Sequence, residues 1–96
     1  MATSIIKFEK KYMIPDYSNR QTVSSVPFTA PTAGIISYIV GDGNAGARGI
    51  TINGTAVASA SLVSGVRATL TAIMDEGDIL NIPNGKWGDL YFFPFK

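Results

Sequence analysis

The dipeptide Asn53-Gly54 constrains the fold of this chain more than any other feature. It lies in the middle of Ile50–Val57, where apolar and polar side chains alternate as in a strand with one buried face. A type I′ turn needs a positive φ at both central residues, and Asn-Gly accepts that conformation readily. The segment predicts a hairpin in which Ile50 and Ile52 face inward, with Ala56 or Val57 returning beside them.

The other segments also read as short strands separated by turns. Turn-forming residues recur about every 8–12 residues, a spacing typical of β-sandwiches. Val66–Met74 alternates cleanly, which predicts a strand with one face formed by Val66, Ala68, Leu70, Ala72 and Met74. A helix through Ala56–Met74 is the competing interpretation, and its content of Ser, Thr, Val and Gly65 disfavours it. We therefore expect an all-β, antiparallel β-sandwich, and the 96 residues fit one domain, 1–96.

The first third of the chain leads into this sandwich. Residues 1–20 are expected to form an arm that packs on the domain, with a short strand at Ser4–Phe8 and a loop anchored by Tyr12, Ile14 and Tyr17. Gln21–Phe28 is expected to be one strand, with its inward side chains at Val23, Val26 and Phe28. Gly34 marks a turn or a close approach of two backbones.

The middle of the chain alternates between apolar strands and glycine-rich turns. Ile35–Val40 is apolar on both faces, which predicts a central strand or a strand at an interface. Gly41–Gly49 holds four glycines in nine residues and is predicted to be a loop. Asp75–Asp78 and Pro83–Gly85 are predicted turns on either side of a strand at Ile79–Ile82.

The closing segment Leu90–Phe95 carries large apolar side chains on both faces of a strand. The chain is 46% apolar and only 16% charged, below the roughly 25% charged residues of typical soluble domains. Both observations predict a buried surface between subunits. The candidate interface residues are Tyr91, Phe93 and Phe95 from this strand, with Ile36 and Tyr38 from Ile35–Val40.

Composition excludes much of the usual chemistry. The chain has no Cys and no His, so disulfides, thiolate or imidazole metal ligands and the usual catalytic triads are ruled out. A net charge of +1 gives no reason to expect a nucleic-acid partner, and no apolar run approaches the roughly 20 residues of a membrane span. We expect no enzyme activity, no cofactor, no metal and no membrane insertion. Asp75, Glu76 and Asp78 are interpreted as a polar turn; a hydrolase that uses one of them as a base is the enzymatic alternative.

Two polar loops carry the candidate ligand-binding residues. Trp87 stands between Asn84 and Asp89, and aromatic rings of this kind stack on sugars while amides and carboxylates bind hydroxyl groups. Asp42 and Asn44 add further oxygen atoms from the glycine-rich loop. The alternative for Trp87 is structural, with the indole closing one end of the sandwich.

The order of four segments resembles that of small trimeric jelly-roll heads. These segments are Phe28–Ile35, Ile50–Gly54, Asp75–Leu80 and the aromatic closing strand. Such heads include the tumour-necrosis-factor-like and complement-type heads and the C-terminal knobs of bacteriophage tail or head fibres. Pro15–Arg20, just before the first core strand, favours the phage group. The chain is shorter than the animal heads and has neither a collagen-like repeat nor a fibrous shaft.

The resemblance implies a homotrimer in the phage virion, made in the bacterial cytoplasm. The expected function is that of a virion structural protein that binds a host-surface glycan or decorates the capsid or tail, in contact with other virion proteins. A monomeric carbohydrate-binding module with no virion role is the alternative.

Overall fold

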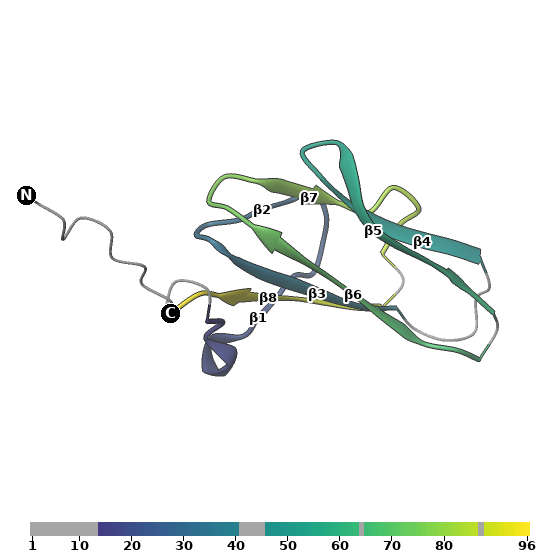
Figure 1. The fold of residues 1–96 in the computed structure, drawn as a ribbon, viewed down its shortest axis with the longest axis horizontal. Coiled ribbons are helices and arrows are strands. Elements are labelled where there is room, and N and C mark those ends of the chain that lie inside the picture. Colours follow the sequence, from purple (N-terminus) through teal and green to yellow (C-terminus); the bar gives the residue numbers. More distant parts are fainter. Residues whose placement is uncertain (1–13, 41–45, 64, 87) are drawn as a thin grey trace, which may run out of the picture.

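A computed structural model of the chain describes residues 14–40, 46–63, 65–86 and 88–96. They form two four-stranded antiparallel sheets that pack face to face (Figure 1). The first sheet has the order β1 (Gln21–Thr22), β8 (Gly88–Pro94), β3 (Gly34–Val40) and β6 (Ala68–Met74). The second has the order β2 (Phe28–Thr29), β7 (Ile79–Asn81), β4 (Gly46–Ile52) and β5 (Thr55–Leu62). The expected all-β sandwich is confirmed, and no helix in these ranges is long and apolar enough to cross a bilayer.

The strand pairs follow a nested pattern. β1 pairs with β8, β2 with β7, β3 with β6 and β4 with β5, all antiparallel. A long hairpin that rolls up on itself gives this set of pairs, which is the topology of a jelly roll. The pairs β3–β8 and β4–β7 complete the two sheets.

The Asn53-Gly54 hairpin forms as the sequence predicts. Asn53 has a φ of 53° and Gly54 a φ of 83°, and Ile52 lies opposite Thr55. The prediction that Ala56 or Val57 faces inward is wrong. The register shifts between Ile50 and Thr51, which leaves Val57 as the extra residue of a β-bulge in β5. The bulge delays the inward face of β5 to Ala58, Ala60 and Leu62.

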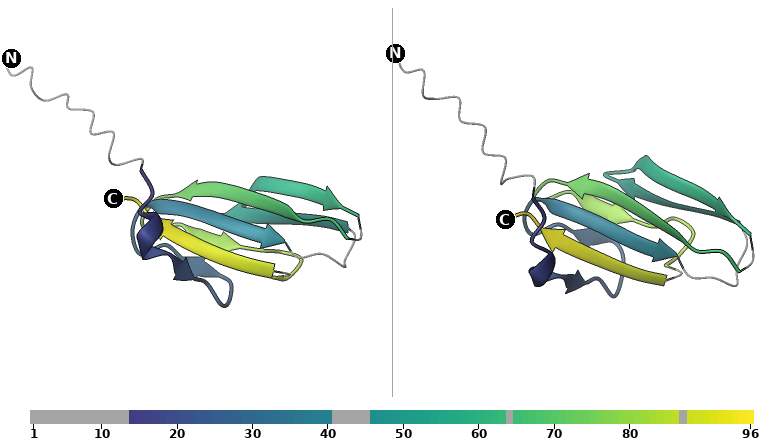
Figure 2. Two further views of the ribbon diagram at one scale, coloured as in Figure 1. Left: turned by 90° about the horizontal axis from the view of Figure 1, so that it is seen from below. Right: turned by 60° about the horizontal axis from the view of Figure 1, so that its bottom comes forward.

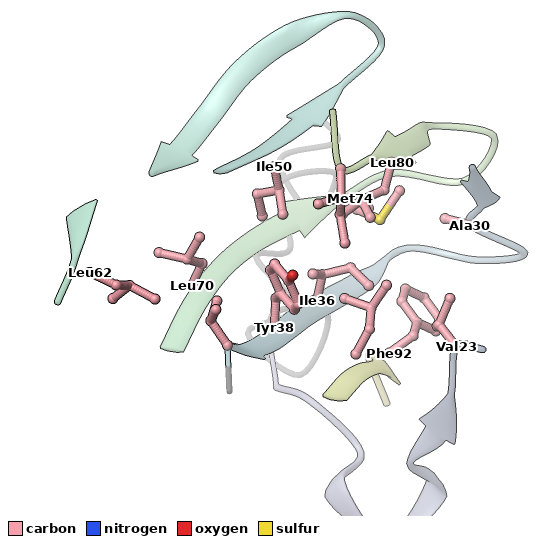
Figure 3. Close-up of a cluster of buried hydrophobic side chains, with 13 residues drawn as sticks. Val23, Ala30, Ile36, Tyr38, Ile50, Leu62, Leu70, Met74, Leu80 and Phe92 are labelled. Carbon is pink, nitrogen blue, oxygen red and sulfur yellow. The ribbon is translucent and has the colours of Figure 1, made fainter. Parts of the chain in front are cut away.

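The core lies between the two sheets (Figure 3). β3 and β8 supply its centre, with fully buried side chains at Ile36, Tyr38, Val40, Leu90 and Phe92. Ile50 and Leu80 meet them from the second sheet, and the rings of Phe28 and Phe92 contact across the layers at 5.3 Å between centroids. Burial of each large apolar side chain is worth about 1.5–3 kcal/mol, so this layer is the main source of stability.

Two boundaries differ from the prediction. Gln21–Phe28 is not one strand: β1 belongs to the first sheet and β2 to the second, and the chain crosses between them through a cis Val26-Pro27 peptide. Val23 is nevertheless buried, and Val26 and Phe28 pack on the core as expected. Gly46–Gly49 belongs to β4 and not to a loop. A Cβ at Gly49 would lie 3.2 Å from the Ala58 carbonyl oxygen, so the missing side chain lets β4 and β5 pair closely.

Candidate functional site

The connections of the sandwich gather at its two ends. At one end, Val40 lies opposite Gly88 and Ala68, and Gly46 lies opposite Leu62. The β3–β4 and β5–β6 connections therefore start and finish there, and the β7–β8 connection, which starts at Asn81 opposite Thr51, finishes there at Gly88. We call this the loop end (right in Figure 1). At the other, terminal end, the Lys96 backbone N–H donates to the Ile14 carbonyl at 2.8 Å.

Of the predicted ligand residues, the structure describes Asn84 and Asp89, and both lie toward the loop end. Asn84 is exposed in the turn after β7, and its Nδ2 donates to the Ala47 carbonyl at the start of β4 at 3.2 Å. Asp89 is exposed near the start of β8. Asp42, Asn44 and Trp87 lie outside the described residues. The topology thus brings the turn after β7 beside the start of β4, 37 positions away in the sequence.

The acidic turn at the terminal end is locked to the Asn53-Gly54 hairpin. The Asp78 carboxylate accepts a hydrogen bond from the Asp75 backbone N–H at 2.8 Å and another from Asn53 Nδ2 at 3.0 Å. Asn53 Oδ1 in turn accepts from the Ile79 backbone N–H at 2.9 Å. The bond from Asp75, followed by that from Asn53, holds the pKa of Asp78 below its ordinary value of 3.8.

These hydrogen bonds give the acidic residues a structural role. Asp75 Oδ1 also accepts from the Glu76 backbone N–H at 2.8 Å, and the Asp78 N–H donates to the Asp75 carbonyl at 3.1 Å, which closes the turn. In the described ranges, no three Asp, Glu, His or Cys residues gather closely enough to hold a metal ion. The sequence pointed to the turn but not to its attachment to Asn53.

The outer face of β8 is partly covered by the same chain. The Arg20 guanidinium carbon lies 4.3 Å from the centroid of the Tyr91 ring, and Tyr17 meets Phe93 edge-on at 5.3 Å. Pro15 bridges to Phe95, and the Asp16 N–H donates to the Pro94 carbonyl at 2.7 Å. Tyr91, Phe93 and Phe95 are consequently half-buried without any partner subunit.

Two of the three predicted anchors of this covering segment contact the sandwich. Ile14 and Tyr17 were expected to anchor it, and both do so although their side chains are 45% and 67% exposed: the Tyr17 ring contacts Phe93, and the Ile14 carbonyl accepts from the Lys96 N–H. Backbone hydrogen bonds and ring contacts along β8, more than burial of these side chains, hold the segment in place. Tyr12, the third expected anchor, and the expected strand at Ser4–Phe8 lie outside the described residues.

Two of the predicted interface residues belong to the core. Ile36 and Tyr38 are 0% exposed and point between the sheets (Figure 3), so their expected role at a subunit interface is wrong. Alternation along β3 places Ile35, Ser37 and Ile39 on the outer face instead, where they are half-buried.

Sequence reasoning also missed Arg48, which is buried and donates from Nη1 to the Ala47 carbonyl at 2.7 Å. Arg48 lies two residues before Ile50 and so shares its inward face in a strand. The neighbouring Gly46 and Gly49 indicated a loop, which hid this alternation.

No family model, curated protein or solved structure matches this chain. Function is therefore inferred from the jelly-roll topology and from what gathers at each end of the sandwich.

Proposed function

We propose that this chain is a structural protein of a bacteriophage particle, held by its terminal end and presenting its loop end to a glycan on the host surface. The observation that carries the proposal is the separation of the two ends. Ile14 and Lys96 are hydrogen-bonded neighbours at the terminal end, while the β3–β4 and β5–β6 connections lie at the other, where the β7–β8 connection also finishes. Attachment to a particle near either residue would leave the loop end pointing outward.

The chemistry of the loop end suits a sugar. Asn84 and Asp89 are exposed there and can exchange hydrogen bonds with hydroxyl groups. Trp87 lies between them in the sequence and supplies the aromatic surface on which a pyranose ring stacks. The described residues enclose no pocket, which favours recognition of an exposed glycan by surface contact.

The sandwich supports this role as a rigid scaffold. Binding residues are commonly carried on loops that a packed framework holds in place. Here the hydrogen bond from Asn84 to Ala47 ties the β7–β8 turn to the first residues of β4, so the packed second sheet supports this turn. Threefold assembly is not part of the proposal, because the β8 face on which it depended is partly covered by Pro15–Arg20.

A glycan array tests the proposal, with the chain immobilised through a tag after Lys96 so that the loop end stays free. We expect binding to bacterial surface glycans, and a loss of about tenfold or more in Trp87→Ala and in the Asn84→Ala/Asp89→Ala double variant. Thr32→Ala, exposed at the terminal end, is the matched control and keeps full binding. Binding to no bacterial glycan, or equal binding by all variants, would contradict the proposal.

A monomeric carbohydrate-binding module remains the second candidate. It is favoured by the cover that Tyr17 and Arg20 give to β8, since a chain that shields its own aromatic face needs no partner there. Electron microscopy of phage particles with gold-labelled antibodies against the chain separates the two. Labelled particles support the virion role, and glycan binding with unlabelled particles supports the module.

A further inference from the structure

One side of the sandwich ends in two long strands with open edges. β5 is the last strand of its sheet and β6 is the last strand of the other, with eight and seven residues. Among the described residues, β5 pairs with β4 alone and β6 with β3 alone. Figure 2 shows β5 at the rim of the molecule. An open edge presents backbone N–H and C=O groups that fit another strand.

The opposite side of the same molecule is protected. Its outermost strands, β1 and β2, have only two residues each. Arg20 directly precedes β1, and Pro27, which has no N–H to offer, directly precedes β2. Very short strands, charges and prolines are the features by which proteins keep strand edges from pairing with other chains.

The β5–β6 side has almost none of these features. Residues 55–74 contain no proline, and their one charged residue is Arg67 in the connection between the strands. Four of the seven exposed large apolar side chains of the described structure also fall in this stretch: Val57, Val63, Val66 and Ile73. The bulge at Val57 disturbs only the start of β5 and leaves Ala58–Leu62 in regular register.

We propose that β5 is a self-association edge, which pairs antiparallel with β5 of a second copy about a twofold axis. Two four-stranded sheets would then join into one sheet of eight strands. A twofold pair centred on Ala60 brings Ser59 of one copy opposite Ser61 of the other.

The residue types of β5 suit its own copy. It contains only Thr, Ala, Val, Ser and Leu, so no like charges meet and the small side chains allow close approach. Twofold dimers with self-complementary surfaces are also the commonest closed assemblies.

Light scattering after size-exclusion chromatography tests the proposal with the full chain. We expect twice the chain mass for the wild type and a single chain for Ser59→Lys/Ser61→Lys, with the dissociation constant of the dimer raised about 100-fold or more. Both serines are exposed, so the sandwich should tolerate lysine there, as circular dichroism would show. Ser24→Lys adds a charge at an exposed serine of the protected side and should keep the dimer.

Hydrogen exchange at low and high protein concentration gives a readout that needs no variant. We expect the added protection on dimerisation to fall on alternate amides of Ala58–Leu62, those that point away from β4. A wild type that stays monomeric, a threefold mass, a dimer unaffected by the two lysines, or added protection on β8 in place of β5 would each overturn the proposal. None of these outcomes depends on glycan binding.

Discussion

Gly34 shows how packing can reserve a single backbone position for glycine. It begins β3 and is buried beneath the ring of Phe92. A Cβ at this position would lie 2.5 Å from Phe92 Cζ and 2.5 Å from the carbonyl oxygen of Phe93. The carbonyl belongs to a paired strand, so it cannot move aside as a flexible side chain would.

We therefore predict that Gly34→Ala lowers the free energy of unfolding by about 2–3 kcal/mol, the upper part of the range for overpacked cores. Urea denaturation followed by circular dichroism measures the loss. Thr32→Ala, exposed two residues earlier, should change stability by less than about 0.5 kcal/mol. A stable Gly34→Ala variant would mean that β3 and β8 can separate without penalty.

For single residues, the sequence predicts the backbone conformation better than it predicts the partners of the side chain. Gly34 was expected at a turn or a close backbone approach, and the second possibility is correct. Asn53 was assigned to the hairpin from its Gly54 neighbour alone. Its bonds to Asp78 and Ile79 could not be predicted, because those residues lie 25 and 26 positions away.

The two turns at the terminal end act as one element because Asn53 and Asp78 are hydrogen-bonded. The pKa of Asp78 is lowered in the folded chain, first by the Asp75 N–H and then by the Asn53 amide. A lowered pKa contributes stability above the pKa of the unfolded state, and that contribution is lost as the pH falls through the folded value.

We predict that the stability advantage of the wild type over Asp78→Asn is full above about pH 5 and shrinks as the pH falls below the ordinary Asp value near 4. Thermal unfolding from pH 7 to pH 2 measures the difference. Asn53→Ala removes the second of the two bonds and should reduce the pH-dependent part. An advantage that grows as the pH falls would show that the carboxylate is not stabilised by these donors.

Strand positions were predicted well where alternation was strong. β6 matches its predicted inward face from Ala68 to Met74. The prediction of one strand over Gln21–Phe28 was wrong, because the spacing of its apolar residues is the same whether the chain stays in one sheet or crosses to the other. The predicted interface at Ile36 and Tyr38 failed for a related reason, since a strand with two apolar faces does not show which face meets the core.

The jelly-roll pairing is a property of the whole molecule, and local patterns could not supply it. β4 and β5 are joined by two residues, but Gln21 of β1 pairs with Phe92 of β8, 71 positions away. The entropic cost of closing a loop rises with the length of the loop. The β4–β5 pair therefore costs least to close and the β1–β8 pair costs most. The resemblance to jelly-roll heads supplied the topology that turn spacing alone left open.

This nesting predicts where folding begins. Gly54 and Gly77 have φ values of 83° and 87°, and an added Cβ would meet nothing within 4 Å at either. Alanine should therefore strain both turns alike, by about 1–2 kcal/mol. Gly54 joins two paired strands, whereas Gly77 lies between strands of different sheets.

If the β4–β5 hairpin is formed in the transition state, Gly54→Ala slows refolding about threefold or more and barely changes unfolding. Gly77→Ala should instead speed unfolding and leave refolding nearly unchanged. Stopped-flow refolding and unfolding across a urea series gives both rates. If Gly77→Ala slows refolding and Gly54→Ala speeds unfolding instead, the turn between the two sheets forms first. The reason is that strain slows refolding only at a turn that is already formed in the transition state.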